Sequence, residues 1–307
     1  VAVKASVLDI LERDGLSVSG VRGEKTVKVP VTEKIDFIPD LCLVAVKTQD
    51  IEKAASANPE ALLAKTVVTT QNGLRAEELL LEYCRPESIV SGIVMFGATS
   101  LQPGRIVHNF EGSLVLGGYD GCPGGGVAAA EELFSAVFPV QSAGNIKGMK
   151  LLKVFINAGN CIPAILGTTM QDAFSDLRVC RISAAVWKEG LRAVLKAGLK
   201  PESLPGFPAE RVFGLAAMPL EQAAGVFHGI MSGLSGEPLY GSILQSIKKG
   251  RPSEIDYFNG EFVRIAAAAG EKAGLNELLV RMVHDVERGG RFFRKEELLR
   301  SADRFLD

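Results

Sequence analysis

The chain has 307 residues, of which 47% are hydrophobic and 23% are charged, and its formal net charge is −2 at pH 7. This length and balance predict two ordinary globular domains and exclude a disordered or fibrous chain. The charge gives no electrostatic reason to expect a nucleic-acid or anionic-membrane partner. The short basic clusters Lys248–Lys249 and Arg291–Lys295 are expected to be solvated surface.

The cysteines are odd in number, widely spaced and without a Cys-x-x-Cys pair: Cys42, Cys84, Cys122, Cys161 and Cys180. This pattern indicates neither a disulfide framework nor a zinc site, so reduced thiols in a cytoplasmic protein are expected. No apolar run approaches the ~18 residues that a membrane helix needs. The N-terminus shows no basic region followed by an apolar stretch, so no secretory signal is expected.

Short apolar runs alternate with helix-like segments in the first half of the chain. Continuous apolar runs at Leu41–Val46, Thr66–Thr70 and Ile89–Val94 predict strands buried on both faces of a parallel sheet. Gln49–Leu63 and Ala76–Tyr83, which lie between them, have helical composition. The alternation predicts an α/β fold with a Rossmann-like, doubly wound parallel sheet.

Further along, Ile106–Asn109 and Ser113–Leu116 are predicted to form a hairpin with its turn at Phe110–Gly112. The glycine-rich loop Gly121–Gly126 follows, and Ala128–Phe138 is expected to be the last helix of this half.

After Gly144 strand signals nearly vanish and helical segments dominate: Lys147–Leu166, Ser175–Ala197, Leu220–Met231, Ser253–Ala273 and Asn276–Arg288. The proline-bounded loop Gly198–Gly206 interrupts them. The sequence therefore predicts an α/β domain at residues 1–143 and an all-helical C-terminal domain at residues 144–307.

The helix at Ser253 has a recognisable start. Pro252 precedes it, and Asp256 lies three residues later, in a variant of the capping box. Glu254 then falls in the first turn, where the helix dipole favours a carboxylate. A purely structural role for Glu254 is as compatible with this pattern as a functional one.

Metal and hydrolytic chemistry have little support. The histidines His108, His228 and His284 match no metal-ligand spacing, so no metal is expected, and His108 is expected to be structural. Neither a Gly-x-Ser-x-Gly elbow nor a catalytic-cysteine signature occurs.

The segment Met149–Gly167 carries the most chemistry. On a helix, Lys153, Asn157 and Asn160 fall at i, i+4 and i+7, which is a single face. Such groups are costly to bury without partners, so the face lines either a polar helix contact or a substrate cleft. A surface lysine with helix-capping amides is the alternative. Lys150 lies about 60° from Lys153, at ~100° per residue, and need not point the same way.

Six further segments stand in a characteristic order along the chain: Val44–Asp50 (VAVKTQD), Gln71–Leu74 (QNGL), Phe96–Thr99 (FGAT) with Pro103–Gly104 and His108, Lys153 with Asn157, Tyr240–Gln245 (YGSILQ) and Gly250–Gly260 (GRPSEIDYFNG). In order and spacing, nearly from end to end, they resemble the ketopantoate reductase family. The resemblance implies a cytoplasmic, NADP(H)-dependent oxidoreductase of pantothenate biosynthesis that reduces a 2-oxo acid, by default 2-dehydropantoate. It leaves a homodimer open.

The resemblance also implies roles for individual residues. Lys153 would be the proton donor and Glu254 the catalytic-site carboxylate. The substrate would be bound by Asn157, Asn160 and Ser242, and the cofactor by Lys4, Lys47 and Asn72. This is chemically consistent, because hydride transfer to a ketone generates an alkoxide that needs a proton and a positive charge. We expect these side chains to converge on a cleft between the two domains.

Two departures from the family pattern weaken parts of this reading. The family repeats asparagine four residues after the first, but here Cys161 stands at that place and Asn160 one earlier. A shift of one position turns the amide by ~100°, which weakens the substrate assignment more than the reaction.

The second departure is at the start, where the sequence has no Gly-x-Gly-x-x-Gly loop. Val1–Lys4 resembles the end of the family's second strand, which would place Lys4 at the 2′-phosphate of NADPH. The resemblance thus implies that the given sequence does not include the family's first strand, loop and helix. Three hypotheses stay open: an NADPH-dependent 2-oxo-acid reductase, a related two-domain dehydrogenase for another oxo acid or an imine, and a non-catalytic ligand-binding protein.

Overall fold

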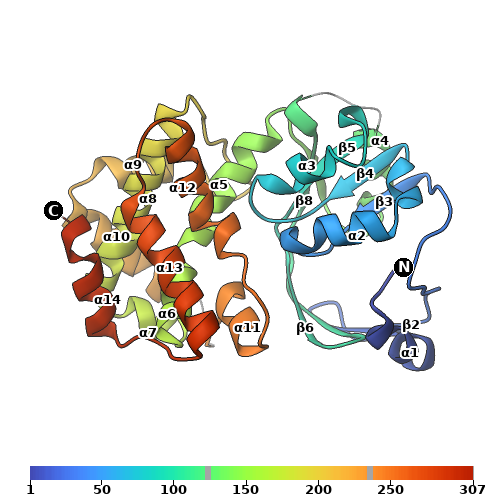
Figure 1. Ribbon diagram of the computed structural model, residues 1–307, viewed down its shortest axis with the longest axis horizontal. Coiled ribbons are helices and arrows are strands. Elements are labelled where there is room, and N and C mark those ends of the chain that lie inside the picture. The colour runs from blue at the N-terminus through green and yellow to red at the C-terminus, as the bar shows by residue number, and fades with distance from the viewer. Residues whose placement is uncertain (122–125, 234–237, 307) are drawn as a thin grey trace. The chain divides into compact units, whose positions relative to one another are not determined.

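The computed structural model describes residues 1–121, 126–233 and 238–306 (Figure 1). The chain divides into two compact units. The first comprises Val1–Gln71 and Arg75–Lys147, and the second comprises the chain from Gly148 onward together with Asn72–Leu74. The structural division thus falls slightly after the predicted boundary at residues 143 and 144. No sequence pattern indicated that the short loop Asn72–Leu74 belongs to the second unit.

A sheet with strand order β3-β4-β5-β8-β9 forms the centre of the first unit. β3, β4 and β5 run parallel, while β8 is antiparallel to β5 and parallel to β9. The strand bounds are Leu41–Val44, Thr66–Thr69, Ile89–Val94, Leu114–Gly118 and Val140–Ser142. The predicted parallel sheet is therefore confirmed, and its first three strands lie where the apolar runs indicated.

Helices cover both faces of this sheet, as the doubly wound prediction requires (Figure 1). α2 (Ile51–Ala57) and α3 (Arg75–Leu80) pack on one cluster of apolar strand side chains, and α4 (Gly126–Ser135) packs on another. The segment Gln49–Leu63, which has helical composition, is helical in three pieces: the 3₁₀ turn Thr48–Asp50, α2 and the 3₁₀ turn Glu60–Leu63. Pro59 explains the end of α2, because the residue before a proline, here Asn58, is disfavoured in helical conformation.

A second sheet in this unit has the order β2-β1-β7-β6, and its strands are Lys25–Val27, Leu16–Gly20, Arg105–Phe110 and Gly97–Gln102. The predicted hairpin of Ile106–Asn109 with Ser113–Leu116 is wrong. β7 pairs with β6 and β1, whereas β8 pairs with β5 and β9 in the other sheet. The hairpin that forms turns at Pro103–Gly104, where Gly104 adopts a φ of 76° that favours glycine.

The first residues also differ from expectation. Val1–Lys4 was predicted to end a strand, but only an isolated bridge between Ala2 and Thr32 forms there. α1 (Ala5–Asp14) follows directly and begins after Lys4, whose backbone is extended.

The second unit is helical, and α8 (Leu177–Lys196) runs through its middle, in contact with α9, α10, α12, α13 and α14 (Figure 1). Trp187 on α8 packs edge-on against Phe155, Phe207 and Phe227. The other helices are α5 (Ile146–Ala158), α6 (Cys161–Leu166), α7 (Met170–Phe174), α9 (Glu210–Ala217), α10 (Leu220–Ser232), α11 (Ser242–Lys248), α12 (Asn259–Ala268), α13 (Gly274–Gly289) and α14 (Lys295–Ala302). The predicted all-helical character is confirmed.

Two predicted helices of this unit are interrupted. The segment Lys147–Leu166 separates into α5 and α6 around Gly159–Asn160, because Pro163 has no N–H to donate to the carbonyl of Gly159. The helix predicted from Ser253 begins at Asn259 instead, after the 3₁₀ turn Ile255–Tyr257.

The expected capping box at Ser253 does not form either. The hydroxyl of Ser253 accepts from the N–H of Ile255 (3.3 Å), and the carboxylate of Asp256 binds His284.

By length and composition the segment Ile146–Leu166 could cross a membrane, contrary to the expectation that no apolar run approaches that length. Two thirds (67%) of its most apolar 18-residue stretch is buried inside the protein, so packing within the fold accounts for its apolar character.

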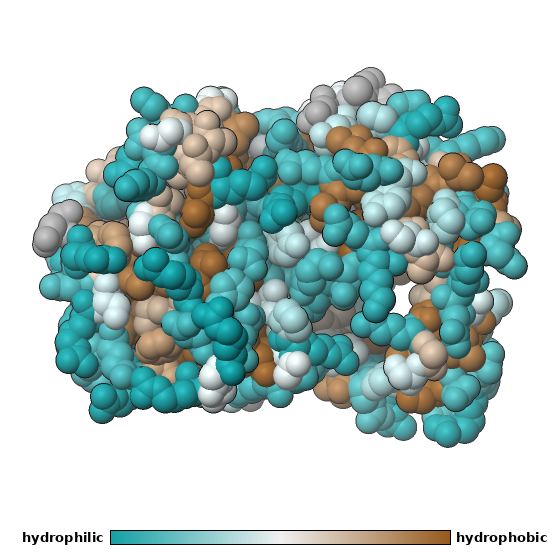
Figure 2. Space-filling model, viewed as in Figure 1, coloured by the Kyte–Doolittle hydropathy of each residue, from teal (hydrophilic) through white to brown (hydrophobic). Residues whose placement is uncertain are grey.

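The face drawn in Figure 2 is largely hydrophilic, with apolar side chains in separate patches.

Candidate functional site

The predicted site residues divide between the units. Lys4 and Lys47 belong to the first, whereas the second contains Asn72, Lys153, Asn157, Asn160, Ser242 and Glu254. The convergence of the whole set on one cleft stays a prediction. The site can be built residue by residue within the second unit.

Lys153 lies on α5, between residues that are fully buried in the core of the unit. Its neighbours Leu152 and Val154 are at most 1% exposed, so α5 is anchored in the core at this point. Lys153 itself is partly buried. The pKa of Lys153 is lowered from 10.5 to about 8, mainly by burial and to a smaller extent by the charge of Lys150, while the carboxylate of Glu254 offsets part of both effects. An ammonium with this pKa is a much better proton donor near neutral pH than an ordinary lysine.

Lys150 affects the charge state of Lys153, which the sequence did not indicate. The sequence left open whether it points the same way as Lys153; Lys150 is only 4% exposed, and its charge acts on Lys153. An offset of about 60° around the helix does not keep the charges of Lys150 and Lys153 apart, because both side chains are long. The two lysines and Glu254 therefore form one coupled group of charges.

Asn157 and Asn160 lie side by side despite the break between α5 and α6. The backbone N–H of Asn160 donates to the carbonyl of Asn157 (3.0 Å), and its side-chain amide lies 3.5 Å from the side-chain oxygen of Asn157. The turn between the helices thus keeps the two amides together, with both side chains partly exposed.

Ser242 comes to this area through α11, which packs against α6. A Cβ added to Gly241 would lie 3.3 Å from the Cβ of Asn160, so the start of α11 fits closely against that asparagine. Ser242 is the first residue of α11 and its side chain is exposed. Asn157, Asn160 and Ser242 therefore offer amide and hydroxyl groups at neighbouring surface positions.

Asn72 lies beside the segment that carries Glu254. The next residue, Gly73, has a φ of 81°, and a Cβ there would lie 2.7 Å from the carbonyl oxygen of Tyr257. Only glycine fits this approach, which holds the Gln-Asn-Gly turn against the 3₁₀ turn that follows Glu254.

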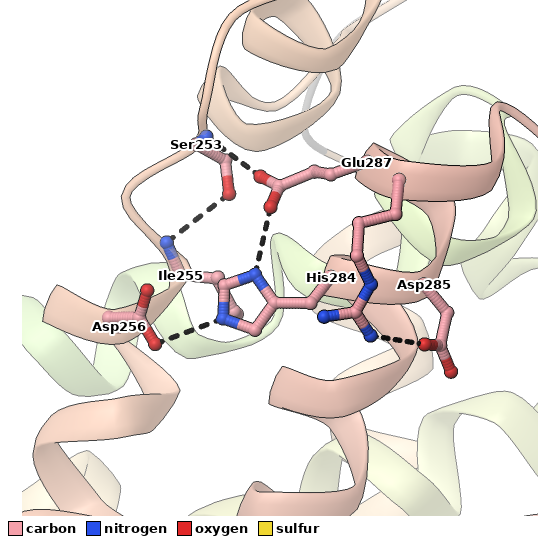
Figure 3. Close-up of polar contacts among 7 residues, drawn as sticks. Ser253, Ile255, Asp256, His284, Asp285 and Glu287 are labelled. Atoms are coloured by element: carbon pink, nitrogen blue, oxygen red, sulfur yellow. Dashed lines mark hydrogen bonds and ion pairs between the residues drawn. The ribbon is translucent and has the colours of Figure 1, made fainter.

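A charged cluster on α13 holds the other side of the Glu254 segment (Figure 3). The carboxylate of Glu287 accepts from the backbone N–H of Ser253 (2.8 Å) and contacts Nδ1 of His284 (2.8 Å). Nε2 of His284 lies 3.1 Å from the carboxylate of Asp256. Sequence reasoning missed this cluster, although the i, i+3 spacing of His284 and Glu287 on a predicted helix was a usable signal.

Cys161 stands where the family repeats its asparagine, and it is fully buried. Its thiol donates to the carbonyl of Ala158 (3.1 Å), and burial raises its pKa to about 12. The thiol is a neutral core group, so this position supplies no polar contact to a substrate.

In the first unit, the ends of β3 and β4 are tied together. The side-chain amide of Gln71 donates to the carbonyls of Val44 (2.8 Å) and Val46 (2.7 Å). Lys47 directly follows, partly buried, at the carboxyl end of β3. Carboxyl ends of parallel strands are where ligands of doubly wound sheets bind.

A nicotinamide dinucleotide, which the family resemblance implies, fits the residues present only in part. Lys4 is exposed at the start of α1, where a helix N-terminus favours a phosphate, and Lys47 follows β3. No Gly-x-Gly-x-x-Gly loop occurs in the sequence to hold the pyrophosphate. Lys4 and Lys47 are therefore the basic residues of this chain that suit the negative charge of a dinucleotide.

A Rossmann-type α/β unit, followed by a helical unit with a partly buried lysine beside a carboxylate, is the arrangement of a two-domain dehydrogenase. The family profile "Ketopantoate reductase PanE/ApbA" matches residues 1–121, and "Ketopantoate reductase PanE/ApbA C terminal" matches residues 145–287. The chain belongs to the ketopantoate reductase family.

Curated relatives extend over most of the chain. A 2-dehydropantoate 2-reductase of Archaeoglobus fulgidus is 27% identical over 279 residues, which cover 90% of this chain and 86% of that protein. The 2-dehydropantoate 2-reductase of Pyrococcus horikoshii is also 27% identical over 279 residues, covering 90% and 85%.

Solved structures share the fold. A PanE/ApbA family ketopantoate reductase from Ralstonia eutropha JMP134 has a TM-score of 0.75 and 24% identity, covering 93% of this chain and 89% of that one. A D-mandelate dehydrogenase, solved with NADH and anilino(oxo)acetate, has a TM-score of 0.75 and 21% identity over the same shares.

Proposed function

We propose that this protein reduces a 2-oxo acid with NADPH, with 2-dehydropantoate to pantoate as the default reaction and Lys153 as general acid. The observation that carries the proposal is a partly buried lysine whose pKa is lowered to about 8 beside the carboxylate of Glu254. Family membership and relatives named 2-dehydropantoate 2-reductase support the reaction class.

Lys153 would have two roles in this reaction. Reduction of the ketone leaves negative charge on its oxygen, and an ammonium beside that oxygen stabilises the charge before transferring its proton. With a pKa of about 8, Lys153 is mostly protonated at pH 7 and still gives up its proton more readily than a solvated lysine.

Glu254 would keep Lys153 protonated. Burial and the neighbouring Lys150 both favour the neutral amine, and the carboxylate of Glu254 offsets part of that preference. Two ammonium groups against one carboxylate leave a net positive charge, which suits an anionic substrate.

The amides of Asn157 and Asn160 and the hydroxyl of Ser242 would bind the carboxylate and hydroxyl groups of the substrate. In the same proposal Lys4 binds the 2′-phosphate of NADPH, and Lys47 and Asn72 contact the cofactor nearer its reactive end. The cofactor supplies the hydride, and the chain's own residues bind, orient and protonate the oxo acid.

A different oxo acid or an imine is the second candidate substrate. The buried Cys161 in place of the family's second asparagine supports it, since the polar contacts at that position differ. A D-mandelate dehydrogenase of the same fold was solved with NADH and anilino(oxo)acetate, which supports including other oxo acids among the candidates.

The test is a panel of 2-oxo acids assayed with NADPH and with NADH, on protein of known intact mass. The expected result is turnover that is most efficient with 2-dehydropantoate and NADPH. Preference for another oxo acid would favour the second candidate. Binding of an oxo acid in calorimetry without turnover would contradict the reductase and favour a ligand-binding protein. A homodimer and a cytoplasmic location belong to the same proposal, and light scattering tests the former.

A further inference from the structure

His284 contacts two carboxylates near Glu254. Asp256 lies two residues after Glu254, and Glu287 on α13 binds the backbone of Ser253, the residue before Glu254. Nδ1 of His284 lies 2.8 Å from Glu287 Oε2, and its Nε2 lies 3.1 Å from Asp256 Oδ1 (Figure 3). Glu287 Oε1 in turn accepts from the backbone N–H of Ser253 (2.8 Å). The segment Ser253–Asp256, with Glu254 inside it, is therefore held to α13 at both of its ends.

This cluster is partly shielded from solvent, which strengthens its charge interactions. The side chains of His284 and Glu287 are 31% and 17% exposed, and that of Asp256 is 49% exposed. Because each imidazole nitrogen faces a carboxylate, both nitrogens can donate only when the ring is protonated. The imidazolium form thus makes two charge-assisted hydrogen bonds at once.

In the part of the chain that the structure describes, the elements packed against α13 add no charge that acts on His284 other than that of Asp256. The segment around the 3₁₀ turn Ile255–Tyr257 contributes Asp256, and α6 carries no charged residue. From α12, the buried carboxylate of Glu261 pairs with Arg264 (2.8 Å).

From α8, Glu189 accepts from the first amides of α13. On α13 itself, Asp285 pairs with Arg288 (2.7 Å). Among the described residues, the charges that act on His284 are those of Glu287 and Asp256.

We propose that His284 is a positioning residue that fixes Glu254 beside Lys153 when its imidazole is protonated and releases the Ser253–Asp256 segment when it is neutral. Only the expected effect of His284 on catalysis rests on the function proposed above. The direct consequence is structural and electrostatic: release of the segment weakens the influence of Glu254 on the ammonium of Lys153.

The pH dependence follows from the two groups in the cluster. Burial disfavours the charged imidazole, but hydrogen bonds and charge from Glu287 and Asp256 outweigh it and raise the pKa of His284 above 6.5. A raised pKa means that this stabilisation is complete below pH 6.5 and is lost as pH rises through the raised value.

Glu287 behaves in the opposite sense. Burial raises the pKa of its carboxyl, but hydrogen bonds from Ser253 and His284 outweigh burial and lower it below 4.5. Its contribution is complete above pH 4.5 and is lost in stronger acid. The segment is therefore held most firmly between pH 4.5 and 6.5.

Hydrogen exchange at the amides of Ser253 and Ile255 tests the release directly. After correction for intrinsic rates, exchange should become faster as pH rises through the His284 titration. His284→Gln should accelerate it about tenfold already at pH 6, the size expected for losing one charge-assisted hydrogen bond. His284→Arg, which keeps a charge and several donors, should restore protection and remove its pH dependence.

The matched control is Asp285→Asn, on the same helix but paired with Arg288 and not with His284 (Figure 3). It should leave the exchange of both amides unchanged. Glu287→Gln is a second test, because it retains an acceptor for the Ser253 N–H while removing the charge. Equal protection in His284→Gln and the parent, in folded protein, would overturn the proposal.

The effect of His284 on the pKa of Lys153 can be measured without any enzyme activity. Lys153 is acylated with a lysine reagent at a series of pH values, and mass spectrometry measures the extent of acylation. The midpoint should lie near the pKa of about 8 in the parent and lower in His284→Gln, because Glu254 raises that pKa. An unchanged midpoint would overturn the positioning role. An inactive enzyme with these shifts intact would contradict only the proposed function.

Discussion

Lys150 and Lys153 lie three residues apart on α5, and the buried charge of Lys150 lowers the pKa of Lys153. This pairing makes Lys150 part of the candidate site and disqualifies it as a neutral comparison for Lys153. Control variants for Lys153 must therefore lie outside this group of charges.

Lys153→Ala should lower kcat and kcat/KM together by about 100- to 10,000-fold, the usual contribution of a general acid. An interaction formed only in the transition state affects both parameters equally, while cofactor affinity should change little. Steady-state kinetics with cofactor titration measures this. Lys196→Ala, on an exposed position of α8, is the control. Activity of Lys153→Ala within a few-fold of the parent would rule out this role.

Lys150→Met should shift the pH profile upward. The acid must be protonated, so activity is expected to fall as pH rises through the Lys153 pKa of about 8. Removing the like charge of Lys150 while keeping an apolar stem raises that pKa, so the decline should begin at higher pH. The kcat/KM profile of both proteins measures the shift. A profile that stays in place would show that the two lysines do not interact.

Asn157→Ala should act on binding more than on turnover. Its amide contacts ground state and transition state alike, so loss of one hydrogen bond should raise KM about tenfold at nearly constant kcat. Asn58→Ala, in the first unit, provides a comparison, since its amide donates to the backbone of α2. A fall in kcat without a change in KM would assign Asn157 to the chemical step.

Lys4→Ala should reduce kcat/KM for NADPH and leave that for NADH nearly unchanged. A lysine that meets the 2′-phosphate forms a charge-assisted contact that NADH does not offer. The measurement is the ratio of the two efficiencies in both proteins. Equal ratios would remove the case for Lys4.

Gly73→Ala should destabilise the protein by more than the ~1 kcal/mol expected from a positive φ alone. A methyl group would lie 2.7 Å from the carbonyl of Tyr257, so the turn must shift. Gly198→Ala is the matched control, because Gly198 has a φ of 71° and no atom within 4 Å of an added Cβ. Denaturant unfolding measures both. An equal loss of unfolding free energy in both variants would mean that the turn at Gly73 rearranges at no cost.

Local sequence was sufficient for the parallel strands and for the helical second half. Apolar runs such as Ile89–Val94 predict buried strands because both faces of a parallel sheet are covered. The spacing of Lys153 and Asn157 placed both on one face of α5, since that depends only on helix geometry. The order of short motifs likewise indicated the family.

Only the tertiary structure decided which distant segments meet. The pairing of β7 with β6 and β1 depends on long-range hydrogen bonds, so no local pattern separated it from a hairpin with β8. The burial of Lys150, the contact of Gly73 with Tyr257 and the bonds of His284 to Asp256 and Glu287 arise in the same way. Burial and charge coupling depend on every element that surrounds a residue, and that environment exists only after the chain has folded.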